Sequence, residues 1–203
     1  MPKGMETPSG GTQGRTGAAS FYARLAGEAW KDVCEPVRLF HAVGSPGRWS
    51  GRFDVSHGPG LAARMLARLM RLPAAGEGLS VRLVVTAEGG RGERWERTFE
   101  GRPFVTSQSE HGEGFLAERV GPVEVLYRLE ADGGALLYRQ ARAALCAGPW
   151  RLRLPRRLAP SVEAREWAEA GEAGVRVRVR VRAPLIGTLV TYEGRVEPEV
   201  KGG

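Results

Sequence analysis

The segment Val175–Arg182 constrains the fold of this chain most strongly, because it alternates Val and Arg four times in succession. Strict alternation of apolar and charged residues is the period of a β-strand with one face in a core and the other in water. A helix would spread the valines around its whole circumference. Weaker forms of the same pattern run from about Val81 onward, so the sequence predicts a large antiparallel sheet.

The size and composition of the chain fit one soluble domain. Its 203 residues are enough to bury a core, and 42% hydrophobic with 26% charged residues is ordinary for a globular protein. We expect a disordered tail over residues 1–19, a single α+β domain over residues 20–197, and a tail over residues 198–203. The chain shows no signal peptide and no long apolar run, which predicts a cytoplasmic location.

The charge balance is basic, with 30 Lys and Arg against 23 Asp and Glu, a net charge of +7. Such a balance requires nucleic acid and anionic membranes to be considered as partners. Acidic residues are interspersed almost everywhere, so the sequence argues against nucleic acid, and an arginine-rich composition also follows from a GC-rich genome. Cys34 and Cys146 are expected to be buried free thiols, with one disulfide as the alternative.

Three helices are expected before or beside the first strands. Ser20 is a plausible N-cap for the first, and Pro36 fits the first turn of a second that ends at His41. The third, Leu61–Leu72, carries leucines and a methionine on one side and arginines on the other, so we expect its apolar side to pack on the sheet. A membrane-surface helix is the alternative.

Nine strands are predicted from apolar alternation and from the turn signals between them. Strands this numerous curl into a half-barrel or a barrel, covered here by the N-terminal helices. The predicted strands are Trp49–Ser56, Val81–Ala87, Arg94–Phe99, Phe104–Ser109, Phe115–Leu129 with a bend at Gly121-Pro122, Ala135–Ala144, Val162–Glu169, Val175–Arg182 and Leu189–Val196.

The hairpin formed by the strands before and after Gly171–Gly174 can be registered from its pattern. Pairing Ala164 with Val179 puts Glu163 opposite Arg180 and Trp167 opposite Arg176 on the outer face. The arginines of this hairpin therefore have a structural explanation as a solvated face. The same register leaves Glu166 on the valine face, opposite Val177.

Two further charges are predicted on apolar strand faces. Arg97 shares its face with Trp95, and Arg119 shares its face with Tyr127. A lone buried charge is costly, so we expect Glu166 to meet Arg97 or Arg119 on the concave face of the sheet.

If all three charges converge, one positive charge is left over, which suits a carboxylate or phosphate head group. Apolar walls that include Trp95 and Tyr127 would then hold the rest of a hydrophobic ligand. A buried ion pair that only fixes the register explains the same residues equally well.

The turn Gly58-Pro59-Gly60 lies between a strand and a helix and superficially matches a dinucleotide-binding fingerprint. Hairpins rather than strand–helix units follow it, so we reject that interpretation. A weaker hypothesis remains, in which free N–H groups at the helix start bind an anion together with His57.

No catalytic constellation is recognised. His41, His57 and His111 are far apart in sequence and lack partners at metal-binding spacing, so they are interpreted as surface or helix-end residues. The sequence predicts no cofactor and no metal, and it favours a binding domain over an enzyme.

Several short motifs together resemble one bacterial family, the domain-of-unknown-function family 4166, over about residues 20–197. The motifs are Phe21-Tyr22…Leu25, Leu39-Phe40-His41, Gly51-Arg52-Phe53-Asp54-Val55, Arg94-Trp95…Arg97-Thr98-Phe99, Glu118-Arg119…Gly121-Pro122, Pro155…Leu158-Ala159-Pro160 and Pro184-Leu185-Ile186-Gly187…Leu189-Val190…Tyr192-Glu193-Gly194.

Members of that family occur alone or fused behind an NAD(P)-binding reductase domain of the saccharopine-dehydrogenase-like type. The resemblance therefore implies an accessory or ligand-handling role, with no catalytic residues to transfer. The leading hypothesis is a domain that binds a hydrophobic small molecule with an acidic head group. The alternatives are an enzyme or enzyme partner that works with an NAD(P)-dependent reductase, and a binder of anionic surfaces.

Overall fold

A computed structural model describes residues 20–42, 47–89, 91–112, 114–172 and 174–199 of the chain. The tail predicted over residues 1–19 and residues 200–203 of the predicted C-terminal tail lie outside this range. The helical elements are α1 (Phe21–Ala26), the 3₁₀ helix η1 (Gly27–Asp32), α2 (Glu35–Phe40) and α3 (Leu61–Leu69). The strands are β1 (Arg48–His57), β2 (Gly76–Glu88), β3 (Gly92–Phe99), β4 (Arg102–His111), β5 (Phe115–Val120), β6 (Val123–Asp132), β7 (Ala135–Ala147), β8 (Trp150–Arg153), β9 (Ser161–Trp167), β10 (Val175–Ala183) and β11 (Gly187–Pro198).

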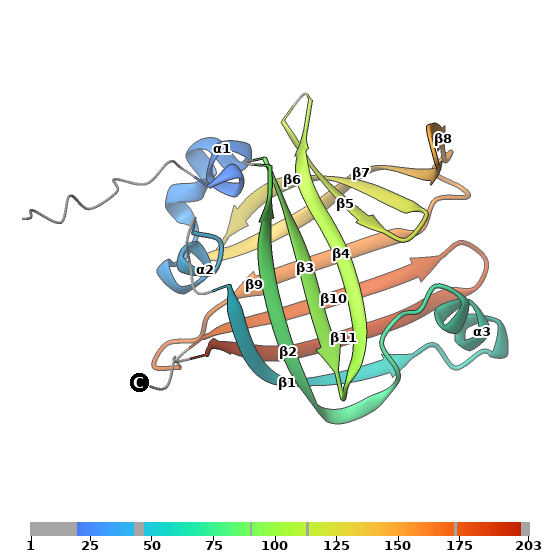
Figure 1. The fold of residues 1–203 in the computed structure, drawn as a ribbon, viewed down its shortest axis with the longest axis horizontal. Coiled ribbons are helices and arrows are strands. Elements are labelled where there is room, and N and C mark those ends of the chain that lie inside the picture. The colour runs from blue at the N-terminus through green and yellow to red at the C-terminus, as the bar shows by residue number, and fades with distance from the viewer. Residues whose placement is uncertain (1–19, 43–46, 90, 113, 173, 200–203) are drawn as a thin grey trace, which may run out of the picture.

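The sheet closes on itself as an antiparallel barrel (Figure 1). The strands follow the order β6-β5-β4-β3-β2-β1-β11-β10-β9-β7, and β7 also pairs with β6, so no edge remains in this ring. Strand β8 is an addition beside β7. The predicted antiparallel sheet with helices is therefore confirmed in outline, but the half-barrel and the count of eight or nine strands are wrong.

The difference in strand count has two local causes. The segment predicted as one bent strand, Phe115–Leu129, is the hairpin β5–β6, in which Val120 pairs directly with Val123 around Gly121-Pro122. Gly121 adopts a left-handed φ of 54°, which a two-residue hairpin turn needs and which glycine adopts without steric cost. The second cause is β8, whose four residues show no alternation of burial.

The register predicted for the β9–β10 hairpin is confirmed. Ala164 pairs with Val179 and Glu166 with Val177, while Trp167 lies opposite Arg176. The cation–π contacts differ from the prediction, because the Trp167 ring lies under the guanidinium groups of Arg165 at 5.4 Å and Arg178 at 6.0 Å. Arg176 instead forms ion pairs with Glu169 and Glu172.

Glycines allow β1 and β11 to approach closely where two of the family-like motifs face each other. Phe53 pairs with Gly194, and Gly51 pairs with Val196. A Cβ atom on Gly194 would lie 2.1 Å from the carbonyl oxygen of Arg52 and 2.4 Å from the Phe53 ring. The Phe53 ring therefore occupies the space that a side chain at position 194 would need.

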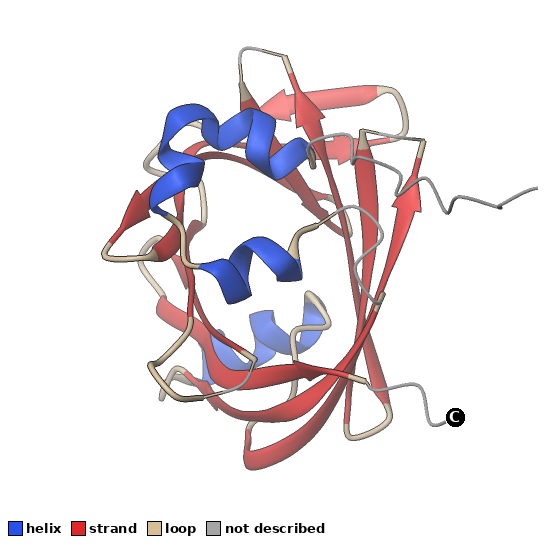
Figure 2. Cartoon of the chain, turned by 90° about the vertical axis from the view of Figure 1, so that its left-hand side faces the viewer, coloured by secondary structure: helices blue, strands red, loops and turns tan. Residues whose placement is uncertain are grey.

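The helices lie at the two ends of the barrel. Viewed from the left-hand side of Figure 1, α2 lies across the near opening beside α1 and η1, and α3 lies at the far end (Figure 2). Ser20 caps α1 as predicted, because its Oγ accepts a hydrogen bond from the N–H of Ala23 at 3.2 Å. No helix in the described residues is both long enough and apolar enough to cross a bilayer.

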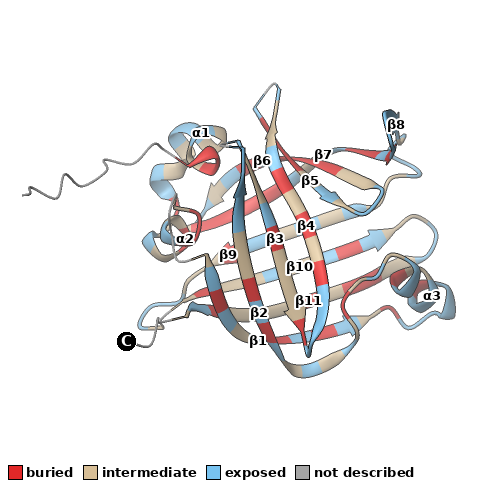
Figure 3. Ribbon diagram, viewed as in Figure 1, coloured by how far each residue is buried: buried red, intermediate tan, exposed pale blue. Residues whose placement is uncertain are grey.

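Buried residues alternate with exposed ones along many strands, because one face of each strand points into the barrel and the other points outward (Figure 3). The main core fills the barrel and includes Trp49, Phe53, Trp95, Phe99 and Tyr192. A small second cluster lies on the outer side of the wall, where Phe115 and Ala117 pack with Leu126. Cys34 and Cys146 are free thiols, and Cys34 is only half-buried.

Helix α3 does not pack as predicted. Ala63 and Ala67 are buried against the barrel, whereas the leucine and methionine side expected to cover the sheet is exposed. Ala63 packs beside Gly58, whose backbone lies against the carbonyl of Thr188 in β11. A larger side chain would not fit at so close an approach, so the alanines face the wall. Leu66 packs half-buried against the core, and Leu61, Met65 and Leu69 point away from it.

We expect Gly194→Ala to lower the free energy of unfolding by about 1–3 kcal/mol, because the new methyl group must displace the Phe53 ring or the β1 backbone. Urea unfolding followed by tryptophan fluorescence measures the change. Gly112→Ala is the matched control, since no atom lies within 4 Å of its Cβ position. Equal stability losses in the two variants would contradict this account of the β1–β11 contact.

Candidate functional site

Polar side chains occupy many inward positions of the barrel wall, where an apolar core is expected. Each must find a partner inside, because burying an unpaired polar group costs free energy. These residues are Glu93, Arg97, Thr106, Gln108, Glu118, Tyr127, Tyr138, Glu166 and Tyr192.

Glu166 is paired with a histidine from a capping helix. The Nε2 atom of His41, the residue that ends α2, lies 2.5 Å from Oε2 of Glu166, and the Tyr138 hydroxyl lies 3.5 Å from the same nitrogen. The His41 side chain is fully buried. The predicted partners of Glu166, Arg97 and Arg119, were therefore wrong. His41 lies at a helix end, as interpreted, but it is buried and not on the surface.

Aromatic rings enclose the imidazole of His41. The ring centroid of Tyr22 lies 3.9 Å away, that of Phe40 lies 4.9 Å away and that of Trp95 lies 5.6 Å away. Among the described residues, Nδ1 of His41 has no hydrogen-bond partner. The pair connects α2 to β9 across this end of the barrel.

Arg97 lies on the inner side as predicted, but without a carboxylate partner. Its guanidinium carbon lies 5.0 Å from the Trp95 ring centroid and 5.9 Å from that of Phe104. Its Nη1 donates a hydrogen bond to Oγ1 of Thr106 at 3.1 Å. Stacking on aromatic faces keeps the charge favourable inside a mostly apolar barrel.

Arg119 is exposed on the outer side of the wall, so its predicted place beside Arg97 and Glu166 is wrong. Its Nε donates a hydrogen bond to the carbonyl of Gly121 at 3.1 Å. The cause is the β5–β6 hairpin: directly paired residues share a face, and Val120 pairs with Val123. Glu118, not Arg119, therefore shares the inner face with Tyr127.

Glu118 ends a chain of hydrogen bonds that starts in helix α1. The Tyr22 hydroxyl donates to Oε1 of Gln108, and Nε2 of Gln108 donates to Oε1 of Glu118 at 3.1 Å. A second carboxylate, Glu93, accepts a hydrogen bond from the indole N–H of Trp95 at 3.0 Å. These two glutamates were missed from the sequence, although both lie at inward positions of strands β3 and β5.

The inner charges therefore differ from those predicted. Among the described inward residues, three carboxylates, those of Glu93, Glu118 and Glu166, face one guanidinium, that of Arg97, and the imidazole of His41. The spare positive charge expected for an acidic head group is not found there. The interior is instead rich in hydrogen-bond acceptors.

Burial affects the titration of this interior. It raises the pKa of the Tyr192 hydroxyl to about 12, and it raises the pKa values of Tyr22, Tyr127 and Tyr138 well above the ordinary value. All four hydroxyls therefore stay protonated at neutral pH and can donate hydrogen bonds. Burial likewise raises the pKa of the Glu93 carboxyl.

An apolar cavity of about 50 Å³, called here the mouth cavity, lies inside the barrel at the end near α3. Its polar lining residues are Glu118, Tyr127 and Tyr192, so the predicted site residue Tyr127 does line a cavity. The remaining lining residues are Met70, Leu72, Phe104, Val120, Val123, Val125, Pro160, Val162, Val179 and Val181.

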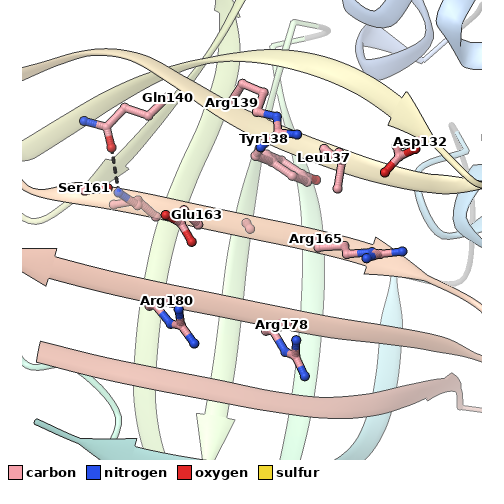
Figure 4. Close-up of a pocket in the computed structure, with 12 residues that line it drawn as sticks. Asp132, Leu137, Tyr138, Arg139, Gln140, Ser161, Glu163, Arg165, Arg178 and Arg180 are labelled. Carbon is pink, nitrogen blue, oxygen red and sulfur yellow. Dashed lines mark hydrogen bonds between the residues drawn. The ribbon is translucent and has the colours of Figure 1, made fainter. Parts of the chain in front are cut away.

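A shallower groove of about 460 Å³ lies on the outer face where β7 and β9 diverge (Figure 4). The two strands pair only from Leu136 to Arg139 of β7. Beyond that point the Gln140 side chain bridges them, accepting from the N–H of Val162 at 2.6 Å and donating to the carbonyl of Pro160 at 2.7 Å. The bridge links the two strands where their backbone pairing ends.

Two of the groups predicted to bind an anion at the start of α3, His57 and the N–H of Gly58, contact carbonyl oxygens of the chain. Nε2 of His57 lies 2.7 Å from the carbonyl oxygen of Pro73, and the N–H of Gly58 donates to the carbonyl of Leu189 at 3.3 Å. Gly60 is the N-cap residue of α3 and makes no side-chain cap. The described contacts therefore give no support to an anion at this turn.

The sequence profile of a domain of unknown function, DUF4166, matches residues 33–196. The chain belongs to the DUF4166 family. This confirms the family inferred from the distributed motifs, which lie at the β1–β11 contact, on the inner side of β3 and in the β5–β6 turn. Among curated proteins, none matches the chain significantly.

Two solved structures are similar to part of this chain. One is a protein of unknown function from the DUF3598 family of Nostoc punctiforme, with 15% identity, a TM-score of 0.40, and coverage of 75% of this chain and 46% of that one. The other is a secretory abundant heat soluble protein from Ramazzottius varieornatus, with 10% identity, a TM-score of 0.34, and coverage of 75% and 93%. The chain thus spans about half of the Nostoc protein, and neither similarity indicates a shared function.

We expect Glu166→Leu to lower the free energy of unfolding by about 1–3 kcal/mol, because it leaves the buried Nε2 of His41 without its hydrogen-bond partner. Glu163→Leu is the matched control on the exposed face of the same strand, and it should change stability by less than about 0.5 kcal/mol. Chemical denaturation measures both. Similar losses in the two variants would contradict a structural role for the His41–Glu166 pair.

The raised pKa of Glu93 predicts a pH-dependent stability difference. Because the folded state binds this proton more tightly than the unfolded state, its contribution is present below the ordinary carboxyl pKa and is lost as pH rises through the higher folded value. We therefore expect Glu93→Gln, which stays neutral, to gain stability relative to the native chain as pH rises above the ordinary carboxyl pKa of 4.5. Thermal unfolding measured as a function of pH tests this, with Glu96→Gln on the outer face of β3 as control. A pH-independent difference for Glu93→Gln would contradict it.

Proposed function

We propose that this domain binds a small, mainly apolar molecule carrying a hydroxyl or amino group, held in the mouth cavity. The observation that carries this proposal is an apolar cavity inside a closed barrel, faced by the Glu118 carboxylate. Ligand sites of small molecules are concave and apolar, with a few convergent polar groups that orient the ligand. The other polar groups of the lining, the hydroxyls of Tyr127 and Tyr192, stand beside the carboxylate.

The cavity is smaller than such a ligand. Its volume of about 50 Å³ compares with about 300–1,000 Å³ for ordinary small-molecule sites, so binding requires the lining to open. Met70 and Leu72 follow α3 and belong to the connection to β2, whereas most of the lining belongs to the barrel wall. Moving these two side chains outward enlarges the cavity without breaking a pair of strands.

The charge of the interior supports a head group different from the acidic one expected from the sequence. A carboxylate oxygen accepts hydrogen bonds, and like charges placed together are destabilising. Gln108 already donates to one of the carboxylate oxygens of Glu118, which leaves acceptor capacity for a ligand hydroxyl or ammonium group. An acidic head group would place a second carboxylate beside that of Glu118.

Matched ligands of one chain length separate these head groups. Decanol, decylamine and decanoate are titrated into the protein and followed by native mass spectrometry and by displacement of a fluorescent apolar probe. We expect decanol and decylamine to bind at least about tenfold more tightly than decanoate. Tightest binding of decanoate would reject the proposed head group, and the absence of all three complexes would reject the cavity as a ligand site.

The cavity is tested with substitutions at neighbouring positions of β10. Val179 faces the cavity and Arg180 faces outward, so Val179→Trp should abolish binding of the probe while Arg180→Trp should leave it unchanged. Because Val179→Trp also risks overpacking, Glu118→Gln provides a second variant of nearly unchanged shape. It should weaken binding of decylamine more than binding of decanol. Equal binding by all three variants would place the ligand elsewhere.

A further inference from the structure

The end of the barrel that holds the mouth cavity also exposes large apolar side chains. Leu61, Met65 and Leu69 of α3 are 68%, 64% and 79% exposed, and Leu158 is 64% exposed in the β8–β9 connection. Leu185, in the β10–β11 turn, is fully exposed. Single exposed leucines are ordinary, but a group of them at one end of a molecule marks an interaction surface.

Contacts place these three segments at one end of the barrel. Helix α3 packs against β11 and β1, and Gly58 before it lies against Thr188, just after the β10–β11 turn. One surface hollow is lined both by Arg156 and Arg157 of the β8–β9 connection and by Leu185. In Figure 1 the helix and the β10–β11 turn lie together at the right-hand end. We call the exposed leucines and methionine of these segments, with the arginines beside them, the mouth surface.

The geometry of α3 sets its apolar stripe outward. Leu61, Met65 and Leu69 are four residues apart and therefore share one face of the helix. The buried residues Ala63 and Ala67 define the opposite direction, toward the barrel. Arg64 and Arg68 are exposed and flank the stripe. An amphipathic helix of this kind, with large apolar residues outward and arginines beside them, is typical of helices that lie in a membrane interface.

The three segments of the mouth surface carry no acidic residues. Residues 57–76, 151–162 and 179–192 contain no Asp or Glu, although the whole chain has 23. The arginines Arg64, Arg68, Arg156, Arg157 and Arg182 are exposed there. Within the described residues none of these five forms an ion pair, while arginines elsewhere, such as Arg176 and Arg178, pair with glutamates. The charge of this end is therefore uncompensated.

We propose that the mouth surface docks the domain onto an anionic lipid bilayer. The apolar side chains would enter the interfacial region, and the arginines would lie at the level of the negatively charged head groups. Docking in this orientation turns the mouth cavity toward the membrane, with Met70 and Leu72 between the bilayer and the interior of the barrel. The proposal concerns the surface of α3 and the neighbouring loops, so it does not depend on which molecule the cavity binds.

Charge distinguishes a bilayer from a second copy of the chain as the occupant of this surface. A twofold dimer would bring the same patch of both subunits together, so each arginine cluster would face another without an intervening carboxylate. Like charges opposed across an interface are destabilising. An anionic bilayer supplies both the apolar layer and the opposite charge.

Vesicle co-sedimentation tests the proposal with the full chain. We expect binding to vesicles of phosphatidylcholine mixed with phosphatidylglycerol, weakening as salt is added, and little binding to vesicles of phosphatidylcholine alone. The triple variant Leu61→Ser, Met65→Ser and Leu69→Ser should reduce binding by more than about tenfold. These side chains are exposed, so the variant should keep its fold, which circular dichroism verifies.

Matched controls lie at the opposite end. Leu39 in α2 is 56% exposed there, and Leu39→Ser should leave vesicle binding unchanged. Arg68→Glu should weaken binding by at least about fivefold, the factor that corresponds to about 1 kcal/mol per basic residue at an anionic surface. Arg48→Glu, at the other end of β1 from α3, should have a smaller effect.

Each outcome decides the proposal. No binding to anionic vesicles at low salt would overturn it, as would equal losses in mouth-surface and control variants. A change of oligomeric state in the triple serine variant, without vesicle binding by the native chain, would show that the surface pairs two copies instead. The ligand proposal is tested separately in vesicle-free solution, where the triple variant should keep ligand binding. Conversely, Val179→Trp should keep vesicle binding.

Discussion

The closure of the sheet through β7 is the constraint on which the rest of the structure depends. Because β7 pairs with β6 on one side and with β9 on the other, every strand of the ring has an inner and an outer face. A polar residue that points inward then has no solvent edge to reach and must find its partner inside. Glu166 meets this condition only because α2 carries His41 into the opening. The helix at the end of the barrel thus supplies the hydrogen-bond partner that the inward carboxylate of β9 needs.

The sequence predicted strand faces correctly where a hairpin could be registered by its own pattern. The four Val-Arg repeats determined the β9–β10 register and placed Glu166 inside. The same reasoning failed at Arg119 because it depends on counting residues without interruption. A turn of two residues at Gly121-Pro122 joins even positions of β5 to odd positions of β6, so a hairpin mistaken for a bend exchanges the two faces. The same error placed Glu118 on the outer face, so it was not predicted as an inner residue.

Contacts between segments that are distant in sequence were beyond prediction for a different reason. His41 and Glu166 are 125 positions apart, and alternation within β9 says nothing about which helix covers it. The orientation of α3 was missed because Leu61, Met65 and Leu69 dominate the apolar pattern, whereas Ala63 and Ala67 are its fully buried residues. The backbone at Gly58 lies so close to Thr188 and Ala63 that only small side chains fit on this side of the helix. The spacing between these segments is set by the folded structure and cannot be read from the sequence.

The two ends of the barrel differ in what it costs to open them. At the closed end, moving α2 would separate His41 from Glu166 and leave polar groups unpaired among aromatic rings, which is expensive in a dry interior. At the mouth, moving Met70 and Leu72 would lose only dispersion contacts and apolar burial, because both are apolar side chains in the connection after α3. Segments whose displacement breaks few buried contacts are the ones that open most often in folded proteins. Any exchange of a guest between the interior and its surroundings should therefore take place at the mouth, on the same side as the exposed leucines and arginines.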